Sequence, residues 1–196
     1  EKTIYSDWNS DAITTYLYLW QTSGDEKYKN IAVNTLNFFK DNMVTEQGAY
    51  HYFKEDKSKS VRGNLLDNSH LLLTFVEGYV VLNDDSYLKT AKELADYSLN
   101  ELYDWNSGGF FERHSLNIEM YGPGENVKLS KPIQENGIMS YALLKLYKQT
   151  NNLDYLNSGI KTLGLIQDNV AGLDRGYYGV MAAKFAIENN LLKEYD

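Results

Sequence analysis

LLDNSHLLLTFVEGYVVL, residues 65–82, is the stretch that decides the fold, because as a helix it would carry apolar side chains on nearly every face. Only Asp67, His70 and Glu77 titrate within it. A helix that is apolar all round is stable only when neighbouring elements enclose it. The following segment, Tyr87 to Tyr103, carries its apolar residues on one stripe and its charged residues opposite. Together the two segments predict a hairpin of one inner and one outer helix.

The same hairpin pattern occurs on both sides of this central pair. The predicted inner helices are residues 7–21, 65–82, 133–147 and a last one, 179–189, that has no partner in this chain. Tyrosines open the predicted outer helices at Tyr28, Tyr87 and Tyr155, separated by 59 and 68 residues. Repeated helical hairpins stack side by side because one hairpin cannot bury its own apolar face. We therefore expect an all-α fold of about seven helices, arranged as an α/α toroid or a partial toroid.

Segments rich in glycine and aromatic residues follow the outer helices, at residues 47–53, 106–111 and 174–178. We expect a short strand pair in the first and a β-hairpin or lid in the long connection to Lys131. The short turns near Gly24, Asp84 and Asn152 should lie on one rim and the aromatic loops on the other. A functional site is expected on the rim with the long loops.

Composition limits the possible functions. At 196 residues with 43% hydrophobic content, residues 1–196 are expected to form one domain. A net charge of −8 disfavours nucleic acid, and the absence of cysteine excludes thiol chemistry. The three histidines have no ligand spacing and no cofactor motif is present, so we expect neither metal nor cofactor. No apolar run is long enough to span a membrane. The start at Glu1, without a signal-like segment, suggests a mature form or a domain of a longer protein and leaves the localisation unknown.

Acidic and polar residues stand at the start of each predicted inner helix, which would place carboxylates around one mouth. In the central helix Asp67, His70, Thr74 and Glu77 fall on one face. A pair of carboxylates across a cavity suits acid and base catalysis at a glycosidic bond. The candidate catalytic residues are Asp67, Glu135 and His70. The candidate substrate-binding residues are Trp8, Asp11, Glu77, Tyr121 and Tyr177.

Each candidate also has a structural explanation. Asp67, Asp11 and Glu135 could cap helices or favour the positive end of the helix dipole. His70 could be a hydrogen-bonded core histidine, and most of the aromatic residues could be core packing. An enclosed Glu77 needs a base such as Lys145 or Lys184, or water in the lumen.

Several of these motifs together resemble the six-hairpin glycosidase-like toroid of the spermatogenesis-associated thioredoxin-domain family. They are Ser6-Asp7-Trp8-Asn9, Leu65-Leu66-Asp67-Asn68, Gly108-Gly109-Phe110-Phe111 and residues 132–136. The resemblance runs from about Asp7 to Gln167 and implies a fold related to N-acylglucosamine 2-epimerases and several glycoside hydrolases. The chain departs from the family in having Asp67-Asn68 instead of paired aspartates. It also lacks a thioredoxin-like portion and about half of the helices of a full toroid.

Two functions are consistent with the sequence. The first is a carbohydrate-active domain of glycoside hydrolase or sugar epimerase class that acts on an unknown substrate. The second is a noncatalytic helical-repeat module that binds a glycan or a protein through the long-loop rim. An open arc would also expose apolar surface at its end, which a second copy or another domain would cover.

Overall fold

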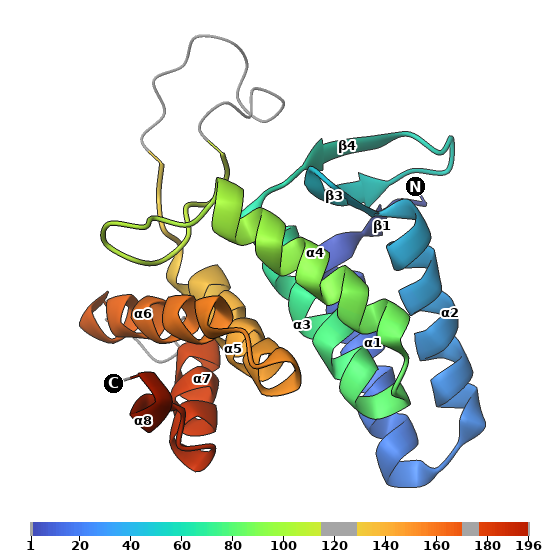
Figure 1. Ribbon diagram of the computed structural model, residues 1–196. Coiled ribbons are helices and arrows are strands. Elements are labelled where there is room, and N and C mark those ends of the chain that lie inside the picture. Colours follow the sequence, from blue (N-terminus) through green and yellow to red (C-terminus); the bar gives the residue numbers. More distant parts are fainter. Residues whose placement is uncertain (1, 115–128, 170–176, 196) are drawn as a thin grey trace, which may run out of the picture.

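The computed structural model describes residues 2–114, 129–169 and 177–195, which form helical hairpins and a small sheet (Figure 1). The helices are α1 (Ser6–Ser23), α2 (Glu26–Asn42), α3 (Leu65–Leu82), α4 (Asp85–Glu101), α5 (Ile133–Thr150), α6 (Leu153–Asn169), α7 (Tyr177–Glu188) and α8 (Leu191–Tyr195). The strands are β1 (Ile4–Tyr5), β2 (Val44–Thr45), β3 (Gly48–Phe53) and β4 (Lys59–Arg62).

The helices form an arc of an α/α toroid, as predicted. Helices α1, α3, α5 and α7 contact one another in that order as the inner layer. Helices α2, α4 and α6 each pack on the inner helix that precedes them. The sheet lies on the rim where α1 and α3 begin, and the α1–α2 and α3–α4 turns lie on the opposite rim (Figure 1).

The short turns between the helices of each hairpin follow from local chemistry. Gly24, Asn83 and Asn151 end the inner helices in the left-handed conformation, which glycine and asparagine tolerate best. Asp25 and Asp84 then begin the outer helices by accepting a hydrogen bond from a backbone N–H two residues later. Because Asp84 caps α4, this helix starts and ends two residues earlier than the apolar stripe predicted.

The tyrosines that open the outer helices connect successive hairpins. The Tyr87 hydroxyl donates to Asn37 Oδ1 of α2 at 3.2 Å, and the Tyr155 hydroxyl to Asp96 Oδ1 of α4 at 2.6 Å. Asn37 and Asp96 are themselves 59 residues apart, the spacing of Tyr28 and Tyr87. The repeat in the sequence is therefore a repeat of contacts between outer helices.

Enclosure of the inner helices depends on their place in the arc. Every residue of α3 from Asp67 to Gly78 is buried, as expected for a helix with neighbours on all sides. Helix α1, which was predicted as an inner helix, is enclosed only in part, because Tyr18 is 47% and Leu19 39% exposed. Within residues 2–114, 129–169 and 177–195, helix α1 ends the inner layer and has an inner neighbour only on the α3 side. Val180 and Ile187 of α7 are exposed at the other end for the same reason.

The C-terminal hairpin differs from the prediction. The last apolar helix was expected to lack a partner, but α8 follows it and packs on α6 and α7. Asn190 adopts the left-handed conformation and reverses the chain, which allows Leu191 to be fully buried. The described residues therefore contain one helix more than the sequence predicted.

The predicted strand pair at residues 47–53 is confirmed. Strand β3 pairs antiparallel with β4 and also with β1 and β2, and Ile4 lies opposite Phe53 in the β1–β3 register. The β-hairpin or lid predicted before Lys131 falls largely on residues 115–128, outside the described residues.

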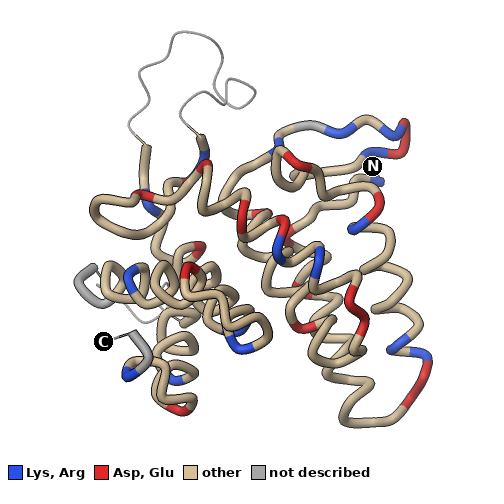
Figure 2. The backbone as a smooth tube through the Cα atoms, viewed as in Figure 1, with Lys and Arg blue, Asp and Glu red and all other residues tan. Residues whose placement is uncertain are grey.

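Basic and acidic side chains are interspersed along the described chain (Figure 2). None of the helices described here has the length and apolarity that crossing a membrane requires.

The contacts between outer helices can be tested by removing single hydroxyl groups. We expect Tyr87→Phe and Tyr155→Phe each to lower the free energy of unfolding by about 1 kcal/mol, because each loses one hydrogen bond between hairpins. Urea denaturation measures this change. Tyr28→Phe is the matched control, since no described residue hydrogen-bonds to the Tyr28 hydroxyl, and equal effects of all three substitutions would contradict the repeat of contacts.

Candidate functional site

Asp7, His51 and Asp67 meet where the sheet joins the inner helices. Asp7 lies in the first turn of α1, His51 in β3 and Asp67 in the first turn of α3. One ligand-type atom from each lies within 4.8 Å of the other two. His51 Nδ1 is 3.1 Å from both carboxylate oxygens of Asp67. Three segments that are far apart in the sequence thus supply one group of titratable side chains.

The backbone around this group is fixed by hydrogen bonds. Asn64 caps α3 by accepting the Asp67 N–H at 2.8 Å. The buried Asn68 accepts the Ala49 N–H and donates to the Asn64 carbonyl, which ties the start of α3 to the strand that carries His51. An aspartate could accept but could not donate. Asn68 therefore has a structural role, as both donor and acceptor, that an ionised aspartate could not fill.

The electrostatics of the group favour a proton on His51. Burial raises the pKa of Asp67, which is fully buried, and its hydrogen bond with His51 acts in the opposite direction. The same hydrogen bond raises the pKa of His51 above its ordinary value, against the effect of burial. Among the described residues, Asp7 Oδ1 is buried without a hydrogen-bond partner. A protonated His51 places one positive charge between two carboxylates.

The same three side chains also have the atom types and spacing that could hold a cation. The histidine spacing in the sequence gave no indication of this, because the two other groups are aspartates from helices that are far apart in the sequence. An imidazolium and a bound cation serve the same electrostatic purpose here, since both offset the two negative charges.

Below this group, polar pairs continue along the contact between α1 and α3. Asp11 Oδ1 is 3.2 Å from His70 Nδ1, and Thr14 Oγ1 is 3.4 Å from Thr74 Oγ1. The Thr74 hydroxyl also donates to the Ser10 carbonyl at 3.2 Å. The predicted polar face of α3 is thus real, and it is paired with α1 along most of its length.

Glu77 ends this series at the far end of α3. It is 3% exposed and pairs with Lys145 of α5 at 2.5 Å, so the predicted partner Lys145 is confirmed. The other predicted partner, Lys184, lies beside Glu188 instead. Burial and the negative charge of Glu77, which accepts a hydrogen bond from the Tyr18 hydroxyl, raise the pKa of Tyr18. One carboxylate therefore links α1, α3 and α5.

The structure separates the functional and capping explanations of the acidic residues. Asp67 and Asp11 do not cap helices, because their carboxylates bond to histidines. His70 is 7% exposed and hydrogen-bonded, in agreement with the core-histidine explanation as well as with a supporting role. Glu135 is half-buried in the first turn of α5, and no described side chain forms a hydrogen bond or ion pair with it.

The aromatic candidates are dispersed. Trp8 is 71% exposed, and its ring lies 5.1 Å from that of Tyr5, which in turn lies 5.4 Å from the His51 ring. Tyr177 is 61% exposed at the start of α7. Tyr121 lies outside the described residues. Trp8 is thus the candidate aromatic residue that the contacts connect to His51.

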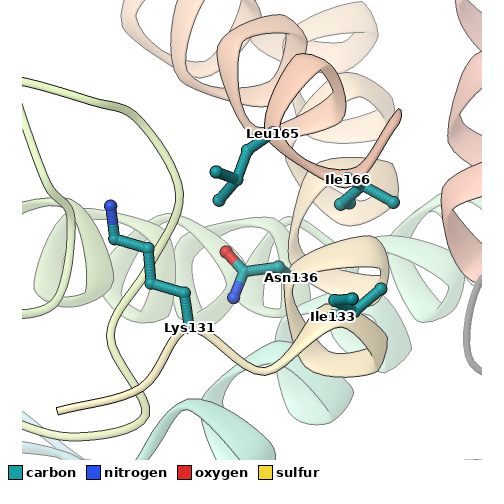
Figure 3. A pocket seen from close by; sticks show the side chains of 5 residues that line it. All are labelled: Lys131, Ile133, Asn136, Leu165 and Ile166. Atoms are coloured by element: carbon teal, nitrogen blue, oxygen red, sulfur yellow. The ribbon is translucent and has the colours of Figure 1, made fainter. Parts of the chain in front are cut away.

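A cavity of about 190 Å³ lies elsewhere, between α5 and α6 (Figure 3). Its lining residues are Lys131, Ile133, Asn136, Leu165 and Ile166. Both polar ends of Asn136 bond to the Phe110 backbone, and Lys131 Nζ bonds to Asp104 and the Gly108 carbonyl. These polar groups hold the loop at Gly108 and Gly109 in place, so their hydrogen bonds are made within the protein.

The arrangement of inner and outer helices is that of the six-hairpin glycosidase-like toroids. The chain is similar to a glycoside hydrolase family 76 α-mannanase of Bacteroides thetaiotaomicron, with a TM-score of 0.79 and 16% identity over 96% of this chain and 54% of that one. It is also similar to an unsaturated glucuronyl hydrolase of Bacillus sp. GL1, with a TM-score of 0.67 and 17% identity over 89% and 48% of the two chains. Identities this low show the fold alone.

Among curated proteins, a cellobiose 2-epimerase of Bacteroides fragilis is 24% identical over 158 residues, which cover 78% of this chain and 38% of the epimerase. No protein-family model matches the chain. The chain thus spans about half or less of the length of the proteins to which it is similar.

The pairing of His51 with Asp67 can be measured by NMR titration of the His51 ring. We expect its pKa to lie above 6.5 in the native chain and to fall in Asp67→Asn, where burial remains but the carboxylate is lost. Because the folded-state pKa is raised, the stabilising contribution is fully present below about pH 6.5 and is lost as the pH rises through the folded-state value. Asp25→Asn, at the opposite end of the helices, is the control, and an unchanged His51 titration in Asp67→Asn would contradict the pairing.

The Glu77–Lys145 pair predicts strong coupling between two substitutions. Glu77→Leu should lower the free energy of unfolding by about 3 kcal/mol, because it leaves a largely buried ammonium group unpaired. Adding Lys145→Met should recover most of this loss in thermal or urea unfolding. Lys184→Met is the control, with a change within about 0.5 kcal/mol at an exposed pair. Additive effects of Glu77→Leu and Lys145→Met would show that the two side chains do not interact.

Proposed function

We propose that this chain is part of a carbohydrate-active enzyme of glycoside hydrolase or sugar epimerase class, with its acid and base centre at Asp7, His51 and Asp67. The observation that carries the proposal is the meeting of these three side chains at the end of the inner helices, beside the exposed ring of Trp8. Glycoside hydrolysis needs a proton donor and a carboxylate close to one sugar ring, and epimerisation needs groups that remove a proton and return it.

The three groups divide this work according to their exposure. Asp67 is fully buried and does not reach a ligand, so it is a positioning residue that orients His51 and favours its protonated form. The His51 side chain is 27% exposed, and with Nδ1 bonded to Asp67 its Nε2 is the nitrogen that exchanges a proton with substrate. Asp7 is partly exposed and supplies the carboxylate that stabilises positive charge or accepts a proton.

The aromatic surroundings support a sugar as the ligand. The Trp8 indole is the most exposed large apolar side chain of the described residues and is held against Tyr5. Aromatic faces bind the apolar faces of sugar rings, and Tyr5 places this surface next to His51. Tyr177, and Tyr121 outside the described residues, are the other candidates for such contacts.

The similar proteins support the same class of ligand. Their names describe a mannanase, a glucuronyl hydrolase and a cellobiose epimerase. In this proposal Glu135 stays a second acid candidate on α5, while Asp7 is the carboxylate that the structure brings to Asp67. The narrower resemblance to the spermatogenesis-associated thioredoxin-domain family also stays a proposal, supported by the motifs of the sequence.

The second candidate function is a noncatalytic module that binds a glycan through the same surface. The complete burial of Asp67 favours it, because a buried carboxylate also has a purely structural use in holding β3 on α3. In this case binding would depend on Trp8 and would not depend on the proton carried by His51.

Turnover and binding of neutral oligosaccharides distinguish these functions. We expect His51→Gln and Asp7→Asn to reduce turnover of manno- or gluco-oligosaccharides at least about a hundredfold, as expected for loss of a general acid or base, at a temperature where circular dichroism shows that each variant is folded. Trp8→Ala should weaken binding about tenfold. Trp105→Ala, at another exposed tryptophan, is the control. Binding that depends on Trp8 with no turnover in the native chain would favour the module, and no binding by either measure would overturn both functions.

A further inference from the structure

We propose that Asp11 and His70 form a second sugar-binding position, which accepts a neutral sugar unit through its hydroxyl groups and rejects a uronate. This inference rests on the proposed function, because it assigns the ligand unit next to the one at Asp7 and His51. It extends the proposal from a class of chemistry to a class of substrate.

The position of Asp11 suits the neighbouring sugar unit. Asp11 follows Asp7 by four residues on α1, and His70 follows Asp67 by three on α3, so both lie about one helical turn further along the same contact between the helices. One turn corresponds to roughly 5–6 Å, which is of the order of one sugar ring. A ligand that reaches from His51 along this contact would therefore place its next unit beside Asp11.

The Asp11 carboxylate is held ready to accept hydrogen bonds. His70 Nδ1 holds Asp11 Oδ1 at 3.2 Å, and the His70 side chain is only 8% exposed, which makes it a fixed anchor. The Asp11 side chain itself is 61% exposed, and no described residue bonds to its Oδ2. An oriented acceptor loses less conformational entropy when a ligand hydroxyl binds.

An aromatic side chain of another inner helix, Tyr178, interacts electrostatically with this carboxylate. Burial raises the pKa of Tyr178 on α7, and the negative charge of Asp11 raises it further. Tyr178 also packs at 5.5 Å against the exposed Tyr177. Tyr177 and Tyr178 are therefore the aromatic side chains that this proposal assigns to the sugar unit at Asp11.

Charge decides which sugar unit fits. Asp7, Asp11 and Asp67 place three carboxylates along this contact against the one imidazolium of His51, and Lys145 is paired with Glu77 at the far end of α3. A neutral unit offers hydroxyl donors to Asp11, whereas a uronate adds a further negative charge and no donor on its carboxylate. The surface therefore favours neutral over uronic units.

Two disaccharides of the same linkage and stereochemistry test this inference, β-1,4-mannobiose and its di-uronic counterpart. Calorimetry on the whole chain should give at least about tenfold tighter binding of mannobiose. Asp11→Asn keeps an oxygen for His70 but removes the charge, so the preference should fall below about threefold, mainly through tighter binding of the uronate. Asp25→Asn makes the same change of net charge at a distant helix cap and should leave the preference intact.

The outcomes separate this inference from the function on which it rests. Equal binding of both disaccharides by the native chain, or a preference that Asp11→Asn leaves unchanged, overturns the charge selection while the carbohydrate function stands. A loss of selectivity equal in Asp25→Asn and Asp11→Asn also overturns it, because net charge alone would then explain the preference. Absence of binding to either disaccharide overturns the proposed function together with this inference.

Discussion

The contact between α1 and α3 is polar along its length, and the arrangement of the site depends on it. Four residues of α1 recur at helical spacing, and each meets a residue of α3. The pairs are Asp7 with Asp67 through His51, Asp11 with His70, Thr14 with Thr74, and Tyr18 with Glu77. Buried polar groups are costly unless they are hydrogen-bonded. A shift of one helix by a single turn would break these pairs together. The polar contact therefore fixes the register of the two helices and, with it, the position of each titratable group at the rim.

This register explains why β3 belongs to the site. The strand carries His51 between the two helices, and the hydrogen bonds of Ser6 to the Tyr50 carbonyl and of Asn68 to the Ala49 N–H hold it there. The sheet is small, yet it joins the starts of α1 and α3. The strand thus supplies a basic group, His51, to the acidic residues in the first turns of the two helices.

Much of the architecture could be predicted from the sequence because local chemistry determines it. The bounds of α3 follow from an enclosed apolar run between Asn64 and Asn83, which cap its two ends. The exposure of α1 could not be predicted, because an uncharged run shows that a helix can be enclosed but not that a neighbour is present. The five-residue α8 is too short to show helical periodicity.

The site was only partly predictable for a related reason. Asp67, His70, Asp11 and Glu77 could be identified as one polar face of a helix and the acids beside it, since helical spacing is visible in sequence. The pairing of Asp67 with His51 depends on how a strand packs across two helix starts, and the alternation of Tyr50-His51-Tyr52 was the one available signal. Glu135 was selected because it begins an inner helix, but position at a helix start does not show which side chains meet.

The three tryptophans offer the most direct measurement of where a ligand binds. Trp8 lies beside the His51 group, Trp20 near the opposite end of α1 and Trp105 in the loop after α4. Their indole N–H signals can be followed by ¹⁵N NMR during titration with a neutral oligosaccharide. The present account predicts a saturable shift of the Trp8 signal with the other two unchanged, and a shift confined to Trp20 or Trp105 would contradict it.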